Sequence, residues 1–543
     1  VAMHPLALSP GRQSNHDIRT EYGPSQACFL RKFSDEIIYM VKLTWHRNDY
    51  WFLLWFFLFV SLGRIGQLHG AQQPNVLMIM VDDLNDWIGC LGGHPQAKTP
   101  NMDALAQRGV LFTQAHCVAP ACRPSRTAIF TGKLPSKTGA WTNASDDVIA
   151  DLAIEQLLPG YFSLHGYETL GTGKLLHGGR LHLFDQGYQT EQRWSPFTRK
   201  RVEYTVAEQP TKGSNHPRHV VPDGPGGEEI ALPLNGLPSE RQPDTRSGES
   251  FDWGPLKVAD TAMGDTRITD WAIEQLRQRR NQPFFMAVGY YRPHIPLYAP
   301  ARDFEVLPPV QEIQLPEILA RDLSDVSQEA RRWAREPVTA GTHHQVEASG
   351  QWADAVRAYL ASVHFVDRQM GRLVAALDAS PHADRTIIVL MSDHGWHLGE
   401  KEHWGKWTGW AESTRIPLIL VPPLDPTSPQ FGQRCEEPVS LLDIFPTLVD
   451  LCHLPPAPWL DGVTLRPQLE NPGQQAGRHV LTWFDAGNVV LTSRHWRYLH
   501  YADGSEELYA SSREDPGQWF NLAGQPQMHE RLHRLRAMVL EAN

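Results

Sequence analysis

Cysteine is scarce in this sequence of 543 residues, and its six cysteines, at positions 28, 90, 117, 122, 435 and 452, are widely scattered. Their number and spacing exclude a disulfide-rich scaffold and a zinc knuckle. Cys435 and Cys452 are candidates for a disulfide in an oxidising compartment. We predict no bond between Cys117 and Cys122, because such a bond would consume a candidate nucleophile.

Basic residues are also in deficit. The sequence has 50 Lys and Arg residues against 61 Asp and Glu residues, which gives a formal net charge of −11. The whole-chain charge therefore offers no basic footprint for nucleic acid, and we predict no nucleic-acid partner. A site for an anionic ligand has to be built locally.

The sequence lacks a long hydrophobic run. Its most prominent apolar run, residues 50–62, is too short for a comfortable membrane span. Lys42, His46 and Arg47 precede this run, and the small residues Gly70 and Ala71 follow it, as in a secretory signal peptide. We predict a signal peptide or a retained N-terminal anchor at residues 40–71, after a non-structural extension at residues 1–39. Either alternative predicts an exported protein, periplasmic or secreted, and residues 50–62 would anchor it to a membrane if they are retained.

Two unbroken apolar segments are typical of buried parallel strands. Residues 76–81 precede Asp82 and Asp83, and residues 386–391 precede Asp393 and His394. Ligands of open α/β sheets gather beyond the carboxyl ends of such strands. Adjacent carboxylates at this edge would repel each other unless a cation joined them.

The periodicity predicts an α/β domain with a smaller companion. Apolar residues spaced by three and four between 359 and 377 indicate a helix that packs on a doubly wound sheet. We assign residues 72–472 to the catalytic domain, with a variable insertion at about 195–255 that is dense in Pro, Gly and charge. Short strand-like segments after residue 480 and a final helix from about Met528 predict a C-terminal antiparallel α+β subdomain at 473–543.

The segment Cys122-Arg123-Pro124-Ser125-Arg126 has the features of an anion site. It places a thiol in a loop before a proline, a serine suited to helix capping, and a helix that would start with an arginine. Helix N-termini favour anions such as sulfate or phosphate. A single cysteine is nevertheless more often a small buried apolar residue than a nucleophile.

The order Cys-x-Pro-Ser-Arg, continuing to Thr131-Gly132, resembles the modification motif of the type I sulfatases. In that family an enzyme of maturation, the formylglycine-generating enzyme, oxidises the cysteine to formylglycine. The resemblance implies that Cys122 is the precursor of an aldehyde whose hydrate attacks sulfur with one hydroxyl and expels sulfate with the other. It also implies a large mixed sheet of the alkaline phosphatase/sulfatase-like fold.

The resemblance extends to a metal site. The two strand ends resemble the sulfatase site that normally binds Ca²⁺, with the modified Cys122 side chain as a further ligand. The implied ligands are Asp82, Asp83, Cys122, Asp393 and His394.

Three further segments supply the cations that a sulfate ester needs. They are residues 171–177 (GTGKLLH), 290–296 (YYRPHIP) and 399–406 (GEKEHWGK), and together with Ser-Asp-His-Gly-Trp at 392–396 they resemble the iduronate-2-sulfatase branch. Lys174 and His177 would lie on one face if their segment were helical. Four tryptophans at 396, 404, 407 and 410 are equally typical of a sugar platform and of a protein core.

The resemblance assigns a role to each cationic position. Arg126 would brace the hydrated aldehyde, whereas Lys174 and His177 would hold its hydroxyls and the sulfate, with His177 as the base that completes turnover. His294 and Lys406 would bind sulfate oxygens, and one of them would assist the leaving alkoxide. Lys401 and His403 compete with Lys406 for its role, and the spacing after Trp404 favours Lys406.

The sequence therefore predicts a sulfuric ester hydrolase that acts on a sulfated sugar, with the 2-O-sulfate of a uronic acid as the expected group. Two alternatives remain open. The same layout suits a phosphate or phosphonate monoester hydrolase, and a protein that binds sulfated glycans without catalysis would retain the fold.

Overall fold

The computed structural model of the protein describes residues 73–188, 193–197, 206–210, 217–221, 230–237, 251–337, 341–423, 432–510 and 514–542. The predicted extension and the signal peptide or anchor lie outside these residues. In the described part of the chain, no helix combines the length and apolarity that crossing a bilayer requires.

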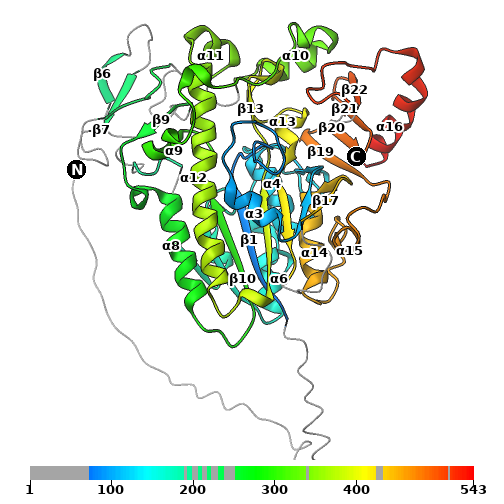
Figure 1. Ribbon diagram of the computed structural model, residues 1–543. Helices are drawn as coiled ribbons and strands as arrows, with labels where there is room; N and C mark the ends of the chain where they lie inside the picture. Colours follow the sequence, from blue (N-terminus) through cyan, green and yellow to red (C-terminus); the bar gives the residue numbers. More distant parts are fainter. Residues whose placement is uncertain are drawn as a thin grey trace, which may run out of the picture. The chain divides into compact units, whose positions relative to one another are not determined.

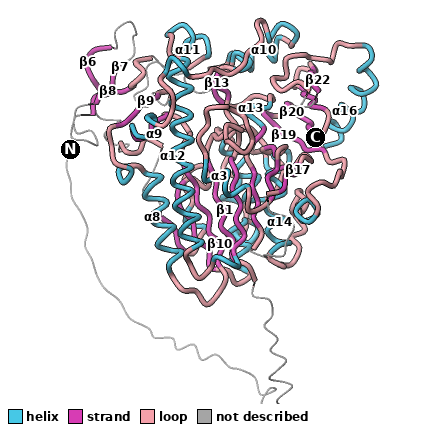
Figure 2. Tube along the Cα trace, viewed as in Figure 1, coloured by secondary structure: helices cyan, strands magenta, loops and turns pink. Residues whose placement is uncertain are grey.

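A mixed sheet of eight strands lies at the centre of the described chain (Figures 1 and 2). Strands β12, β1, β10, β4 and β5 run parallel to one another, whereas β16 pairs antiparallel with β12. The strands lie in the order β17 (Gln433–Cys435), β2 (Val110–Phe112), β16 (Leu418–Val421), β12 (Thr386–Ser392), β1 (Asn75–Val81), β10 (Phe284–Tyr290), β4 (Glu168–Gly173) and β5 (Gln186–Tyr188).

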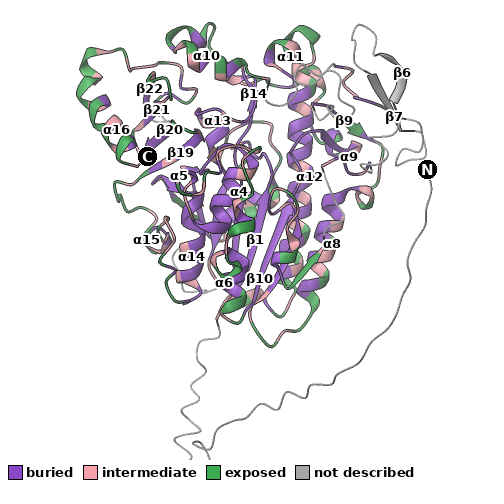
Figure 3. Cartoon of the chain, turned by 180° about the vertical axis from the view of Figure 1, so that it is seen from behind, coloured by how far each residue is buried: buried purple, intermediate pink, exposed green. Residues whose placement is uncertain are grey.

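Helices cover both faces of this sheet, which explains the unbroken apolarity of β1. Its residues Leu77 and Ile79 pack with α12 (Trp352–Asp378), α8 (Gly264–Arg277) and α3 (Pro100–Ala106). Val76 and Met78 face the opposite core, which contains α4 (Cys122–Thr131), α6 (Leu158–Leu164) and α14 (Ile444–Leu451). Figure 3 shows the sheet as buried and the outer sides of the helices as exposed. The predicted doubly wound α/β architecture is confirmed.

A four-stranded antiparallel sheet follows near the C-terminus, as the sequence predicted. It consists of β19 (His479–Asp485), β20 (Asn488–Ser493), β21 (Trp496–His500) and β22 (Glu506–Ala510), and α16 (His529–Ala542) packs against it. Its inner side chains, including Trp483 and Tyr498, belong to the same core as one face of the large sheet. The tail is therefore packed onto the catalytic part of the chain.

Short strands occupy the described parts of the variable insertion. β6 (Val206–Pro210), β7 (Pro217–Val221) and β8 (Ile230–Leu232) form an antiparallel three-stranded sheet. β9 (Trp253–Leu256) pairs with β11 (Leu297–Pro300), a strand that follows β10 and its loop. The rest of this predicted insertion lies outside the described residues.

The candidate disulfide between Cys435 and Cys452 is not formed, because both residues are free buried thiols. Cys435 ends the edge strand β17, whereas the Cys452 thiol follows α14 and interacts with the Tyr167 hydroxyl. Cys117 and Cys122 are also free, as predicted.

A substitution at Gly289 tests the close approach of β10 to the end of β4. A Cβ at this position would lie 2.1 Å from the Lys174 carbonyl oxygen, so Gly289→Ala has to push these strand ends apart. We expect the free energy of unfolding to fall by about 1–3 kcal/mol, as in other overpacked cores. Gly524→Ala is the control, because a Cβ there meets nothing within 4 Å, and its effect should stay within about 0.5 kcal/mol. Equal denaturation midpoints for the two variants would contradict this expectation.

Candidate active site

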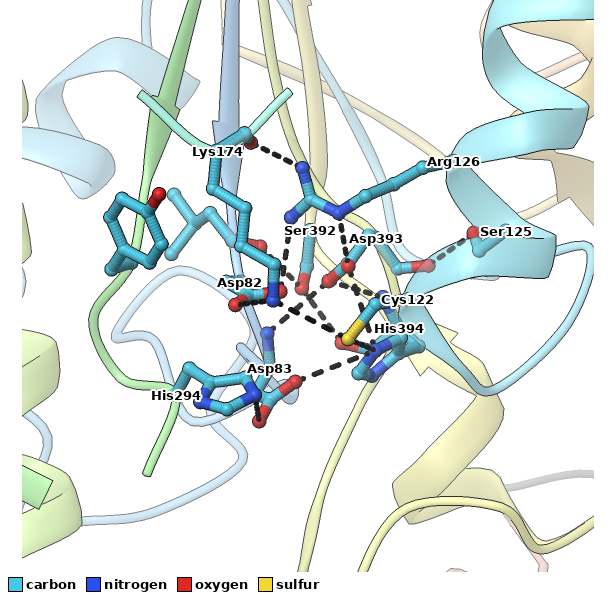
Figure 4. Close-up of polar contacts among 12 residues, drawn as sticks. Asp82, Asp83, Cys122, Ser125, Arg126, Lys174, His294, Ser392, Asp393 and His394 are labelled. Atoms are coloured by element: carbon cyan, nitrogen blue, oxygen red, sulfur yellow. Dashed lines mark hydrogen bonds and ion pairs between the residues drawn. The ribbon is translucent and has the colours of Figure 1, made fainter. Parts of the chain in front are cut away.

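Four strand ends and one helix start deliver charged side chains to a single place (Figure 4). Asp82 and Asp83 follow β1, and Asp393 and His394 follow β12, whose Ser392 pairs with Val81. Lys174 follows β4 directly, and His294 lies in the loop after β10. Cys122 is the first residue of α4. The candidate residues therefore gather at the carboxyl edge of the parallel strands.

Helix α4 begins at Cys122, which corrects the prediction that Ser125 caps a helix starting at Arg126. The preceding residue, Ala121, is extended (φ −153°), and no side chain caps the helix. Ser125 lies within the first turn, and its hydroxyl donates a hydrogen bond of 2.6 Å to the Asp393 carbonyl oxygen. The helix ends at Gly132, which has a left-handed backbone (φ 67°). The serine thus ties α4 to the end of β12.

Arg126 connects three of the strand ends from a fully buried position. Its Nε donates to Asp393 Oδ2 (2.7 Å), and another guanidinium nitrogen donates to Asp82 Oδ1 (3.0 Å). The third nitrogen donates to the carbonyl oxygens of Lys174 and Leu175. Burial favours the neutral arginine, but Asp393 and Asp82 outweigh this effect and raise the pKa of Arg126. The guanidinium is therefore a fixed positive charge.

A potential metal site lies beside this arginine. Asp82, Asp83, Cys122 and His394 are all buried and offer donor atoms within 4.8 Å of one another. Asp83 Oδ2 is buried without a hydrogen bond in the described structure, and its ionic neighbour His294 Nε2 lies 3.8 Å away. An unsatisfied buried carboxylate oxygen is costly unless a cation or proton occupies it. The carboxylate pair and this orphaned oxygen fit a hard cation such as Ca²⁺.

Asp393 is the one predicted ligand outside that four-residue cluster, although it adjoins it. Its Oδ2 accepts from Arg126 and lies 3.5 Å from His394 Nε2, and its Oδ1 accepts from the backbone N–H of Asp83 at 3.2 Å. Both oxygens therefore already have donors. In this arrangement Asp393 orients the neighbouring donor groups.

The two adjacent aspartates differ in their affinity for protons. Burial is the largest influence on Asp82, but Lys174, His294 and Arg126 outweigh it and hold the pKa of Asp82 well below its usual range. Burial raises the pKa of Asp83 to about 7, against the opposing effect of Lys406. Asp83 is thus the carboxylate whose burial the positive charges of the protein offset only in part.

Two lysines reach the thiol of Cys122. Lys406 Nζ lies 3.0 Å from Cys122 Sγ and 2.8 Å from Asp83 Oδ1. Lys174 Nζ lies 3.4 Å from the same sulfur and forms an ion pair with Asp82. Burial opposes the charge of Lys406, but Asp83 and Cys122 raise its pKa, so the group stays an ammonium ion. The cations predicted from three separate segments do converge.

His177 lies farther along the loop after β4, which is not helical, so the condition under which Lys174 and His177 would share a helix face is not met. Its Nδ1 is 3.4 Å from a guanidinium nitrogen of Arg123. Burial, followed by Lys174 and Arg123, lowers the pKa of His177 to about 4, so its imidazole is neutral at neutral pH. Burial and Lys174 also lower the pKa of His294.

Arg123 is a neighbour of the site that the sequence analysis did not single out. Its backbone N–H donates to Asn143 Oδ1 (2.8 Å) and its side chain to the Ser145 carbonyl oxygen (3.0 Å), which holds it against His177. Its position directly after Cys122 is the one feature of the sequence that could have identified Arg123 as a residue near the site.

The competitors of Lys406 are used elsewhere. Lys401 pairs with Asp322 (2.7 Å), and His403 bonds the carbonyl oxygens of Ala334 and Lys406. The tryptophans at 396, 404 and 410 are buried in the core, which leaves no platform for a sugar at these three positions. The Trp396 ring instead lies 5.6 Å from Lys406 Nζ and supports its charge.

Comparisons with the sequences of known proteins point to one family. The family model described as Sulfatase matches residues 74–454. A sulfatase of Formosa agariphila is 34% identical over 483 residues, which cover 87% of this chain and 87% of that protein. The iduronate 2-sulfatase of Mus musculus is 29% identical and is matched over 80% of this chain and 79% of its own length. The solved structure of a 2-O GAG sulfatase has the same fold, with a TM-score of 0.62 at 21% identity, and the match covers 87% of this chain and 92% of that one.

The carboxylate cluster predicts calcium binding that depends on Asp83. In isothermal titration calorimetry of the EDTA-treated protein, we expect Asp83→Asn to weaken the affinity for Ca²⁺ about 100-fold, because it removes a buried negative charge. Asp86→Asn is the matched control, since Asp86 lies on the same segment but pairs with Arg415. Calcium at about 1,000 times its Kd should stabilise the wild type by about 4 kcal/mol. Unchanged affinity in Asp83→Asn, or no uptake by the wild type, would refute the site.

Proposed function

Because the chain belongs to the sulfatase family and is a sulfuric ester hydrolase, we propose that it removes the 2-O-sulfate of a uronic acid in a glycosaminoglycan-like saccharide. The observation that carries this proposal is the meeting of two ammonium groups and a carboxylate cluster at Cys122 Sγ. The relative named iduronate 2-sulfatase, which is similar over most of both chains, supports this choice of sugar.

Formylglycine at residue 122 is the proposed nucleophile precursor. Its hydrate would supply one hydroxyl that attacks sulfur and a second whose loss of a proton releases sulfate as the aldehyde re-forms. The Cys122 side chain is 2% exposed in the folded chain. A formylglycine-generating enzyme would therefore have to act before this part of the chain folds.

The surrounding residues divide the remaining tasks. Lys174, Lys406 and His294 would bind the sulfate oxygens, and one of the latter two would assist the leaving alkoxide. His177 would accept the proton that completes turnover, since its imidazole is neutral at neutral pH, although its lowered pKa makes it a weak base. Arg126 would hold Asp82 and Asp393 in place throughout.

Asp82, Asp83, His394 and the modified residue 122 would hold calcium, with Asp393 beside them. The ion would supply positive charge next to the sulfate oxygens. The bound ion would also balance the negative charge of Asp82 and Asp83 that the basic residues of the protein leave over.

We extend the proposal to the location of the protein. The layout of residues 40–71 supports export to the periplasm or the medium, with residues 50–62 as the anchor if they are retained. A sulfated saccharide outside the cell would be an accessible substrate.

Mass analysis and substrate comparison test the reaction. The active native protein should carry formylglycine in the peptide that contains residue 122, and Cys122→Ala should lose turnover about 1,000-fold or more. Desulfation of defined disaccharides should favour the 2-O-sulfated uronic acid, and aryl sulfate should be a better substrate than aryl phosphate. An unmodified thiol in active protein would refute the aldehyde mechanism. A strong preference for phosphate, or tight saccharide binding without sulfate release, would refute the proposed function.

Substitution of two nearby lysines, Lys406 and Lys401, distinguishes a role in catalysis from a role in stability. Lys406→Met should lower kcat about 100- to 1,000-fold, because it removes a charge beside the reacting group. Lys401→Met, the matched variant, breaks the buried pair with Asp322 and should lower the free energy of unfolding by about 3–5 kcal/mol at nearly normal kcat. Urea unfolding and steady-state kinetics measure both effects. A larger kcat defect in Lys401→Met would reverse the assignment.

A further inference from the structure

A separate cavity of about 410 Å³ opens on the outer side of the loop that carries Lys406. Its lining comes from α10 (Gln328–Arg335), α11 (His343–Ser349) and the hairpin of β13 (His397–Leu398) and β14 (Trp404–Gly405), together with the segment before α10. Figure 1 labels α10, α11 and β13. Its walls come from three segments: residues 318–322, residues 342–347 and residues 399–402, with Arg335 at one side. Cavities that bind small molecules and single sugar units have this size.

Ion pairs hold two of the walls together. Lys401 Nζ and Asp322 Oδ1 form a buried pair at 2.7 Å, which joins the hairpin to the 318–322 segment. Arg335 and Glu402 pair at 2.8 Å across the opening. These four charges compensate one another, so they give the cavity its shape more than its charge.

Other polar groups of the lining remain available. Arg321, His344 and Glu347 are exposed, and their side chains form no hydrogen bond or ion pair with the described residues. His343 is only 6% exposed, and its Nδ1 is buried without a hydrogen-bond partner in the described structure. This nitrogen is not accessible from the cavity, so the polar groups free to meet a ligand are those of Arg321, His344 and Glu347.

The same cavity offers an apolar surface beside these groups. Ile318 and Leu319 belong to its lining and are 45% and 39% exposed. A sugar ring presents C–H groups on its faces and hydroxyls at its edge, so an apolar wall next to unsatisfied donors and acceptors matches its chemistry. The guanidinium of Arg321 has no ion pair with the described residues, so it can pair with a carboxylate or a sulfate of such a unit, whereas the carboxylate of Glu347 can accept hydrogen bonds from its hydroxyls.

The position of the cavity connects it with the reaction. Lys406 directly follows β14, and its carbonyl oxygen lies 2.9 Å from Nε2 of His403, one residue past the lining position Glu402. The hairpin therefore presents Lys406 to the reacting centre and its outer residues to the cavity. Lys406 or His294 is proposed to assist the leaving alkoxide, so the sugar that bears the ester would extend from the reacting centre on their side.

We propose that this cavity is a second saccharide subsite, which binds an anionic sugar unit of the same chain some way from the sulfate being removed. Arg321 binds the carboxylate or sulfate of that unit, His344 and Glu347 bind its hydroxyls, and Ile318 and Leu319 contact its ring. The subsite rests on the proposed function for its substrate class. It makes the enzyme prefer an oligosaccharide to an isolated sulfated sugar.

The test compares a short with a long substrate in the full-length protein. Turnover of 4-nitrophenyl sulfate, which carries no sugar unit for the subsite, should be unchanged in Arg321→Ala. For a 2-O-sulfated glycosaminoglycan tetrasaccharide, kcat/KM should fall about tenfold or more through KM, because a charge-assisted contact is lost. Arg321→Lys should restore part of the loss. Arg277→Ala, which removes another exposed arginine, on α8, is the control and should affect neither substrate.

Calorimetric titration of the inactive Cys122→Ala variant with the tetrasaccharide tests the subsite independently of the proposed reaction. Addition of Arg321→Ala should weaken this binding about tenfold, even if turnover assays show a preference for phosphate. If Arg321→Ala fails to fold, His344→Ala and Glu347→Gln on the opposite wall provide the same measurement. Equal affinities with and without these changes, or no tetrasaccharide binding, would overturn the subsite.

Discussion

One buried guanidinium makes the active site possible. Arg126 neutralises Asp82 and Asp393 at the ends of two strands and holds the chain after β4 through two carbonyl oxygens. Carboxylates so close together and so deeply buried would otherwise be protonated or would repel each other. Because Arg126 is committed to Asp82 and Asp393, Asp83 has Lys406 as its ion-pair partner and keeps its second oxygen without a hydrogen bond in the described structure. Arg126 therefore determines which carboxylates have a structural role and which one lies at the reacting centre.

The sequence predicted the framework because the relevant signals are local. Unbroken apolar runs identified β1 and β12, and the acidic residues directly after them had to meet once these strands were parallel neighbours. The motif around Cys122 supplied the chemistry by resemblance. The convergence of Lys174, His294 and Lys406 followed from strand ends and spacing, although it needed a known family to turn it into roles.

What the sequence could not predict depends on packing between distant segments. Ser125 looked like a helix cap, yet its hydroxyl serves the carbonyl of Asp393, a partner 268 positions away. Cys435 and Cys452 were possible partners by compartment alone, whereas their separate environments keep them apart. The place of Arg123 against His177 likewise depends on how the loop with Asn143 and Ser145 folds back. No periodicity or composition encodes such contacts.

The C-terminal sheet also supports the loop that carries Lys406. Trp410 Nε1 donates to Glu507 of β22 (3.0 Å), and Arg497 of β21 donates to the Gly409 carbonyl oxygen (2.8 Å). Gln518 accepts from the backbone N–H of Ala411 (2.6 Å). The tail thus works as a scaffold for a residue more than ninety positions earlier in the chain. A substitution in the C-terminal sheet can therefore change the pose of that ammonium group while every residue around Cys122 stays the same.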